Sequence, residues 1–261
     1  MRTPNNKKST QQLETLLQQQ AEKIAQLEKA QELEAALENV RSVSLSIQHS
    51  SQILDVVNTI NKQFQELGLD LDGTLISIRK ENQGKELNSW VNTKISTARY
   101  ASISYYRGLM HTNLLNFLQK EQGLYVEKHP TSRVVKWYAH IFKKPGWKER
   151  PEKDKQALLT SIKNYVRSSW GEEHTALTII RFSGKDFSVT EHQILERLAK
   201  VFEQAYIRFL DIQKAEAKAK EAQIDAAIER IRAKALAMHH SQEVKDIANA
   251  CLLYTSPSPR D

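Results

Sequence analysis

A chain of 261 residues, of which 40% are hydrophobic and 26% are charged, is long enough for one large domain or two small ones. Its longest stretch without a charged residue has 13 residues, well short of the roughly 18 apolar residues that cross a bilayer, so we expect no membrane span. The N-terminus lacks the apolar core of a secretory signal, and the single cysteine cannot form an internal disulfide. These features favour a cytoplasmic protein.

The net charge of +7 comes from the middle of the chain, because residues 67–188 hold 20 basic against 12 acidic side chains. Within this region, Lys128 to Arg167 contains 11 basic and three acidic residues, interleaved with aromatic residues. Such a mixture can bind phosphates and stack bases. We favour the alternative, in which the aromatic residues belong to the core of amphipathic helices and the basic residues form their solvated face. Nucleic acid is therefore not the expected partner.

Residues 11–67 predict a long helix with a narrow apolar seam. The stretch has no Pro or Gly and places apolar residues three, four or seven positions apart, at Leu13, Leu17, Ile24 and Leu27. After a phase slip near Lys29 to Leu33, the stripe resumes at Leu33, Leu37, Val40 and Ile47. A seam this narrow needs a partner helix, so we expect a homodimer through coiled-coil helices.

A second long helix is predicted after Thr190. Its first part carries a broad apolar stripe that suits packing on a domain, formed by Ile194, Leu198, Val201, Ala205, Phe209 and Ile212. Farther along, the sequence becomes Ala-rich and its seam narrows again. A helix from Thr190 to His240 would be about 75 Å long, more than one small domain covers.

Between the two helical stretches the pattern changes to strands and turns. We expect strands near residues 75–78, 85–91, 98–106 and 124–128, inserted helices over 131–144 and 151–163, and two last strands over 165–170 and 175–182. Ser188 or Thr190 is expected to cap the last helix. The order predicts an α+β domain carried between two long helices.

The chain also repeats itself once at long range. Residues 34–58 align without a gap with residues 225–249, 191 positions downstream, and nine of the 25 aligned positions are identical. The matches include Arg41 with Arg232 and His49 with His240, which a shared apolar pattern alone would not produce. A period this long indicates duplication of a whole domain rather than a solenoid repeat.

The closing helix, RLAKVFEQAYIRFLDIQKAEAKAKEAQIDAAIERIRAKALAMHHS, resembles the segment that joins tandem GAF-like sensory domains in bacterial signalling proteins, particularly Bacteroidetes-type sensor histidine kinases. The resemblance covers roughly residues 34–250 and is strongest in the two helix segments. It implies an α+β fold, with a GAF-like antiparallel sheet that has helices on one side and is flanked by long coiled-coil signalling helices. It also implies a dimeric regulatory input module whose output domain lies further along the polypeptide. The last residues, CLLYTSPSPRD, leave the helical register and resemble a translated sequencing adapter.

We therefore expect five segments along the chain. They are an N-terminal coiled-coil helix (1–33), a GAF-like sensory domain with its flanking helices (34–212), a connecting signalling helix (213–240), the start of a truncated second unit (241–250), and a non-native or disordered tail (251–261).

No catalytic constellation stands out in this sequence. His240 lies near Glu243 on a predicted long helix, as a phosphoacceptor would, but His49 occupies the equivalent place in the first copy. The histidines form no metal-ligand pattern, and neither a GxxxxGK[ST] loop nor a GxGxxG motif occurs. We expect no enzyme activity, metal or cofactor in this stretch, although the resemblance implies a histidine kinase for the full-length protein.

A ligand of a GAF-like sheet would lie between one sheet face and the helices or loops that cover it. The candidate ligand-binding residues are Trp90, Tyr105, Tyr106, Tyr138, Trp170 and Arg181, although we favour a plain core or rim role for each of them.

Together these features predict a sensory input module that couples binding of an unknown small-molecule ligand or partner to coiled-coil packing. Two alternatives stay open: a scaffold protein whose coils only oligomerise, and a basic nucleic-acid-binding module centred on Lys128 to Arg167.

Overall fold

The computed structural model describes residues 4–49, 52–82, 86–93, 96–104, 110, 112–144 and 147–236. Its contacts divide the chain into two units, residues 1–208 and 209–261. The α+β domain belongs to the first unit, and the described part of the second unit is the distal portion of the last helix. His240, the predicted start of a second unit and the tail lie outside the described residues.

Two helices precede the sheet where the sequence predicted one. Helix α1 spans Pro4–Ser46 and helix α2 spans Ile53–Glu66. The Gln52 side chain holds the break, because its Oε1 accepts hydrogen bonds from the backbone N–H groups of Gln48 and His49, at 2.8 and 2.9 Å. Ile47, 2% exposed, anchors the turn in the core, so the chain folds back and α2 presents its own apolar face to the domain.

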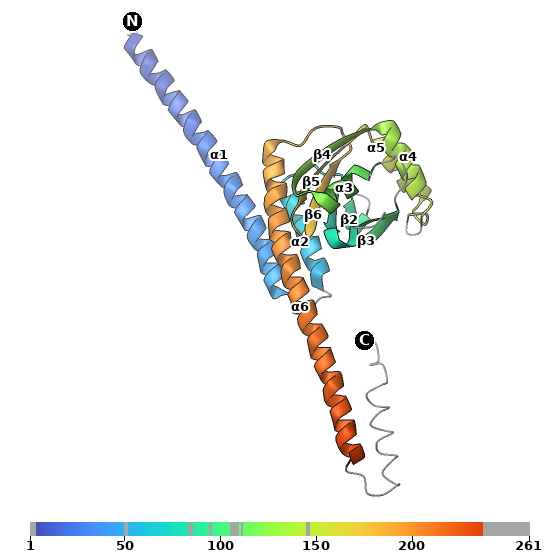
Figure 1. The fold of residues 1–261 in the computed structure, drawn as a ribbon. Coiled ribbons are helices and arrows are strands. Elements are labelled where there is room, and N and C mark those ends of the chain that lie inside the picture. Colours follow the sequence, from blue (N-terminus) through green and yellow to red (C-terminus); the bar gives the residue numbers. More distant parts are fainter. Residues whose placement is uncertain are drawn as a thin grey trace. The chain divides into compact units, whose positions relative to one another are not determined.

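The sheet has six strands, all paired antiparallel, in the order β3-β2-β1-β6-β5-β4. The strands are β1 (Gly73–Ile78), β2 (Glu86–Thr93), β3 (Ser96–Ser104), β4 (Gly123–Pro130), β5 (Asn164–Gly171) and β6 (Thr175–Arg181). The expected α+β class, an antiparallel sheet between long helices, is confirmed (Figure 1).

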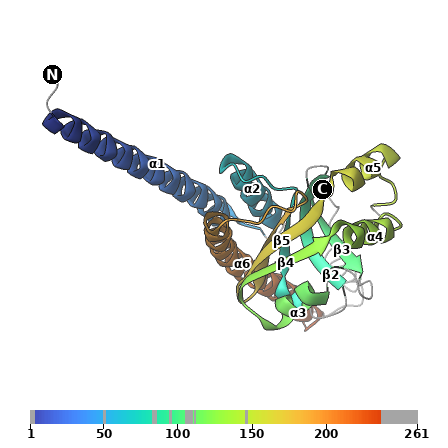
Figure 2. The ribbon, with the colours of Figure 1, turned by 90° about the horizontal axis from the view of Figure 1, so that it is seen from above.

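Helices cover both faces of the sheet (Figure 2). Thr74, Ser168 and Thr175 bond to α2 or to α6 (Val189–Leu236) and define one face, which we call the α6 face. The neighbouring residues Leu75, Tyr165 and Ala176 pack in a cluster with α3 (Thr112–Lys120) and α4 (Thr131–Ile141), and α5 (Glu152–Ser161) adds Leu158. We call this second side the α4 face. The inserted segment between β3 and β5 supplies the helices of this second side.

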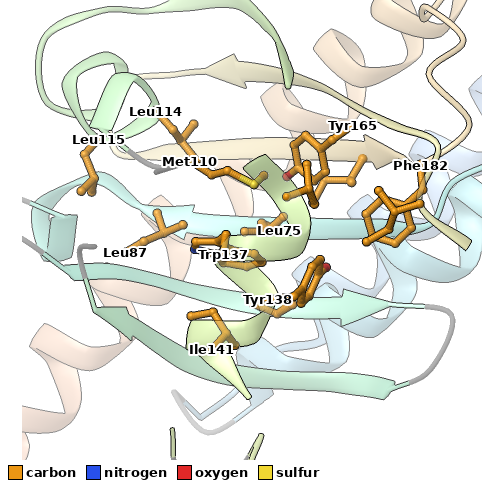
Figure 3. Packing of buried hydrophobic residues seen from close by; sticks show 14 of the residues in the cluster. Leu75, Leu87, Met110, Leu114, Leu115, Trp137, Tyr138, Ile141, Tyr165 and Phe182 are labelled. Carbon is orange, nitrogen blue, oxygen red and sulfur yellow. The ribbon is translucent and has the colours of Figure 1, made fainter. Parts of the chain in front are cut away.

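The central strands β1 and β6 are buried along their whole length, as expected for a sheet between two helical layers. On the α4 face, an aromatic and aliphatic cluster fills the space under α3 and α4 (Figure 3). It contains the aromatic residues of the basic segment, since Trp137, Tyr138, Trp147 and Tyr165 are only 3–6% exposed. These rings are core residues and present no stacking surface to a nucleic acid.

Helix α6 begins at a capping box. The Glu191 N–H donates to Ser188 Oγ at 3.2 Å, and the Ser188 N–H donates to Glu191 Oε2 at 2.7 Å. Of the two expected caps, Ser188 is therefore the one used.

Among the described residues, no helix is both long and apolar enough to cross a membrane.

The phase slip in α1 separates two environments. Leu13, Leu17, Ile24 and Leu27 are 56–61% exposed, whereas Ala36, Leu37 and Val40 are at most 3% exposed. The second part of the helix is held by its own domain: Glu34 pairs with Arg197 of α6, and the Leu45 carbonyl accepts a bond from Arg208.

Candidate functional site

A buried group of charged and polar side chains lies on the α4 face, where β4 and β5 pair. Glu127 and Arg167 are directly opposite each other in the register, so their side chains emerge on the same face of the sheet. The Arg167 side chain is fully buried and pairs with the Glu127 carboxylate. It also donates a 2.7 Å hydrogen bond to the Met110 carbonyl, which ties the segment before α3 to the sheet.

Glu127 accepts from several donors. Its Oε1 lies 3.0 Å from the Asn113 amide nitrogen and 3.1 Å from His129 Nε2. His129 follows two positions later on β4 and therefore points to the same face, and its Nδ1 lies 3.4 Å from the Arg133 guanidinium. We call Glu127, His129 and Arg167, with Asn113 and Tyr125, the charged cluster.

The environment keeps Glu127 ionised. Burial alone would raise the pKa of its carboxyl, but the hydrogen bond from His129 and the charge of Arg167 together lower the pKa to about 2. Tyr125 shows the opposite effect, since burial and the nearby Glu127 charge raise the pKa of its phenol to about 12. It therefore keeps its proton near neutral pH.

This chemistry suits recognition better than catalysis. A carboxyl with a pKa of about 2 is a poor proton donor or acceptor near neutral pH, where general acid–base catalysis works best with a matched pKa. Removing one partner of a buried ion pair leaves an uncompensated charge, so a ligand group that displaced Glu127 or Arg167 would have to replace its charge. Among the described residues there is no group of three or more His, Cys, Asp or Glu side chains that could hold a metal.

The aromatic core borders the charged cluster. The Tyr165 ring centroid lies 6.0 Å from those of His129 and Phe182, and Tyr138 packs edge-on against Trp137 at 4.6 Å (Figure 3). Burial raises the pKa of Tyr138, so its hydroxyl stays protonated. The α4 face thus joins an apolar, aromatic region to a charged one, and the side chains of both regions are largely buried.

The structure does not bring the sequence-predicted site residues together. Tyr138 lies on the α4 face. The other three described candidates, Trp90, Trp170 and Arg181, lie on the α6 face. Their cross-strand partners, Ile76, Leu177 and Val166 respectively, place them there. Tyr105 and Tyr106 lie outside the described residues.

Two of these residues have contacts that hold α6 in place. Arg181 donates to Glu191 at 2.6 Å and to the Asp70 carbonyl at 2.9 Å, and its guanidinium lies over the Phe187 ring at 4.3 Å. Trp170 lies 5.7 Å from the Lys200 ammonium. Trp90 is half-buried and packs edge-on against Tyr100.

Sequence reasoning missed the charged cluster. The strand around GLYVEKHP places Tyr125, Glu127 and His129 at alternate positions, a pattern that reads equally well as the solvent-facing side of an edge strand. Only the register with β5 shows that Arg167 lies opposite and that α3 covers both residues.

A separate small pocket of about 70 Å³ lies where α2 meets the first end of β1, lined by Asn61, Phe64, Gln65, Leu69, Leu71, Asp72, Gly73, Thr74, Asn92 and Thr93. It is several times smaller than the roughly 300 Å³ at which small-molecule pockets begin. Its volume suits a few water molecules.

No family model and no curated protein sequence matches the chain. Among solved structures, one described as "Structure of the GAF domain" is similar, with a TM-score of 0.40 and 16% identity, over 68% of this chain and 88% of that chain. A superposition this loose does not establish a shared function.

Proposed function

We propose that the chain is a sensory input module of a signal-transduction protein, in which binding at the α4 face changes the packing of the helices that flank the sheet and, through them, the packing of a homodimeric coiled coil. The ligand or partner is unidentified. The tandem arrangement suggested by the repeat and the resemblance to GAF-like units favour a cytoplasmic histidine kinase as the full-length protein, with its output domain further along the polypeptide.

The observation that carries this proposal is that the helix leaving the domain is also part of the domain core. Leu195, Leu198 and Phe202 of α6 are fully buried. Glu203, the residue after Phe202, accepts hydrogen bonds from Thr175 Oγ1 and His174 Nδ1, each at 2.6 Å. A rearrangement of the sheet would therefore displace this helix, because closely packed elements shift together between discrete arrangements.

The same strands carry both the charged cluster and the contacts to α6. Arg167 belongs to the cluster, and the next residue, Ser168, bonds His192 of α6 at 2.9 Å. Glu127 belongs to the cluster, and the next residue, Lys128, bonds Asp186, just before α6, at 2.7 Å. A shift of β4 or β5 caused by a ligand would therefore reach the start of α6 through the adjacent residue on each strand.

The scaffold alternative predicts no such coupling, so amide hydrogen exchange separates the two. In the double variant Glu127→Leu/Arg167→Met, apolar side chains replace the ion pair, and the domain should still fold. We expect exchange of α6 amides within residues 189–208 to change severalfold, although the substitutions lie on the opposite face of the sheet.

Lys163→Met, an exposed position just before β5, is the control and should leave α6 exchange unchanged. If the double variant is folded and its α6 exchange equals that of the unaltered chain, the sheet does not communicate with the helix and the scaffold function is preferred.

A further inference from the structure

We infer that the outward side of α4, with the turn that follows it, is a docking surface for an acidic helix of a partner protein. Five basic residues form this surface, which we call the basic face: Arg133, Lys136, Lys143, Lys144 and Lys148. The inference deepens the proposed function by naming the chemistry of a partner. It rests on that function only for the effect of docking on α6.

The basic face is the side of α4 that the domain leaves uncovered. The helix lies across the sheet from α6 (Figure 1), and the stripe that it turns to the core is at most 6% exposed, at Val134, Trp137, Tyr138 and Ile141. The opposite side of an amphipathic helix faces solvent. Arg133 and Lys136 on that side are exposed, as are Lys143 and Lys148 after the helix ends.

The positive charge of the basic face is not neutralised by its surroundings. From Lys128 to Lys148 the sequence has six basic residues and no acidic one. Lys128 pairs with Asp186 at 2.6 Å, but in the part of the chain that the structure describes, no residue of the basic face pairs with a carboxylate. Of the acidic residues that follow, Glu152 pairs with Lys155 of its own helix.

The histidine on the same side of α4 reports this accumulation of charge. Burial and the charges of Lys144 and Lys143 lower the pKa of His140. A surface that disfavours a further positive charge attracts negative ones, over a distance of about 10 Å at 0.1 M salt.

The burial of the remaining side chains favours a protein partner over a nucleic acid or a membrane. The aromatic rings near the basic face, Trp137, Tyr138 and Trp147, are only 5–6% exposed, so they cannot stack on bases. The apolar side of α4 packs in the core of its own domain, so it cannot enter a bilayer as the apolar side of an interfacial helix does.

The spacing of the basic face fits a facing helix. Arg133, Lys136, His140 and Lys143 follow one another at steps of three, four and three residues, and the chain keeps turning after α4, because the Lys143 N–H donates to the His140 carbonyl at 3.2 Å. Such steps place one side chain on each turn, about 5.4 Å apart. Carboxylates at the same steps on a partner helix would lie opposite them.

The basic face also reaches the charged cluster. Arg133 lies 3.4 Å from His129 Nδ1, and His129 Nε2 lies 3.1 Å from the Glu127 carboxylate. A partner carboxylate that pairs with Arg133 draws its guanidinium away from His129. Docking on the outside of α4 would therefore alter the cluster on the sheet beneath it.

Fluorescence anisotropy with labelled peptides and the full chain tests the docking. The probe is a helical Ala/Gln/Glu peptide of about 20 residues, in which Glu recurs at steps of three and four residues along one side. The control peptide has the same composition, with its Glu residues spread around the helix. We expect the probe to bind at least about fivefold more tightly at low salt, and about 0.5 M salt to abolish its binding. Equal binding of the two peptides would overturn the helical fit.

Charge reversal locates the binding. Lys136→Glu/Lys143→Glu should weaken binding of the probe about tenfold, because attractions become repulsions, and the domain should stay folded because both side chains are exposed. Lys136→Gln/Lys143→Gln should cause a smaller loss. Lys218→Glu/Lys220→Glu makes the same change in net charge at exposed positions of α6 and should alter the affinity by less than about twofold. Equal losses in the two reversed variants would mean that net charge, not the basic face, attracts the probe.

Two other anionic partners are alternative outcomes of the same experiment. Vesicles that contain phosphatidylserine and a short DNA duplex should bind the full chain more weakly than the probe does. If either binds more tightly and Lys136→Glu/Lys143→Glu abolishes that binding, the basic face recognises lipid or nucleic acid, and the acidic helix is excluded as its partner.

The failure of this inference differs from the failure of the proposed function. Absence of probe binding overturns the inference, while amide exchange in Glu127→Leu/Arg167→Met still tests the proposed function. Probe binding that leaves α6 exchange within residues 189–208 unchanged confirms the docking surface and contradicts the coupling.

Discussion

Replacing Arg167 with methionine is expected to lower the free energy of unfolding by about 3–5 kcal/mol at neutral pH, the range found when one partner of a buried ion pair is removed. The fully buried guanidinium neutralises Glu127 and bonds the Met110 carbonyl. Without it, an ionised carboxylate stays in the core without its guanidinium partner. Urea denaturation measures the loss.

The pH dependence of this difference follows from the lowered pKa of Glu127. A carboxyl whose pKa falls from 4.5 to about 2 on folding stabilises the folded state above about pH 4.5, and that stability is lost as the pH falls towards 2. The difference between the unaltered chain and Arg167→Met should therefore shrink over this interval.

Two further variants identify the cause of the loss. Adding Glu127→Leu to Arg167→Met should recover most of the lost stability, since no charge is then buried. Lys163→Met should change stability by less than about 0.5 kcal/mol. A loss as large in the double variant as in Arg167→Met would mean that packing, not the ion pair, accounts for the effect.

Truncating Phe202 to alanine is expected to cost about 3–5 kcal/mol, because the side chain is fully buried and its removal leaves a cavity. Phe202 lies on the face of α6 that packs against the domain, near Tyr206, whose ring stacks at 6.5 Å. The cost should appear in denaturation together with faster amide exchange of α6 within residues 189–208.

Ile207 offers a control on the same helix. It is 42% exposed, and Ile207→Ala should cost less than about 1 kcal/mol. If the two substitutions cost the same, α6 is not packed as a core element and cannot carry a signal from the sheet.

The sequence predicted the architecture better than the site. Period-2 and period-3.6 patterns located the strands, helices α4 and α5 and both long helices, because these patterns follow from burial of one side of each element. Helix α3 was not predicted. The break at Gln52 was missed, since the apolar stripe of α1 runs on into α2 almost without interruption. Two hydrogen bonds accepted by one glutamine side chain leave no trace in the periodicity of apolar residues.

The charged cluster could not be predicted because it depends on strand register. Glu127, His129 and Arg167 are residue types found mostly at surfaces, and their burial depends on pairing between strands separated by the whole inserted segment. Most of the site residues predicted from the sequence were large aromatic residues instead. Three of the sequence candidates, Trp90, Trp170 and Arg181, lie on the α6 face, where Arg181 and Trp170 contact side chains of α6.

The most direct test of the central claim is whether the coil and the sheet influence each other, because coupling between two sites is reciprocal. Amide exchange should be compared between the disulfide-linked and reduced forms of a homodimer that carries Gln31→Cys in α1, with the single native cysteine removed by Cys251→Ser. The account predicts that locking the coil changes exchange in β4 and β5, within Gly123–Pro130 and Asn164–Gly171. Identical exchange of these strands in the locked and unlocked dimers would contradict it.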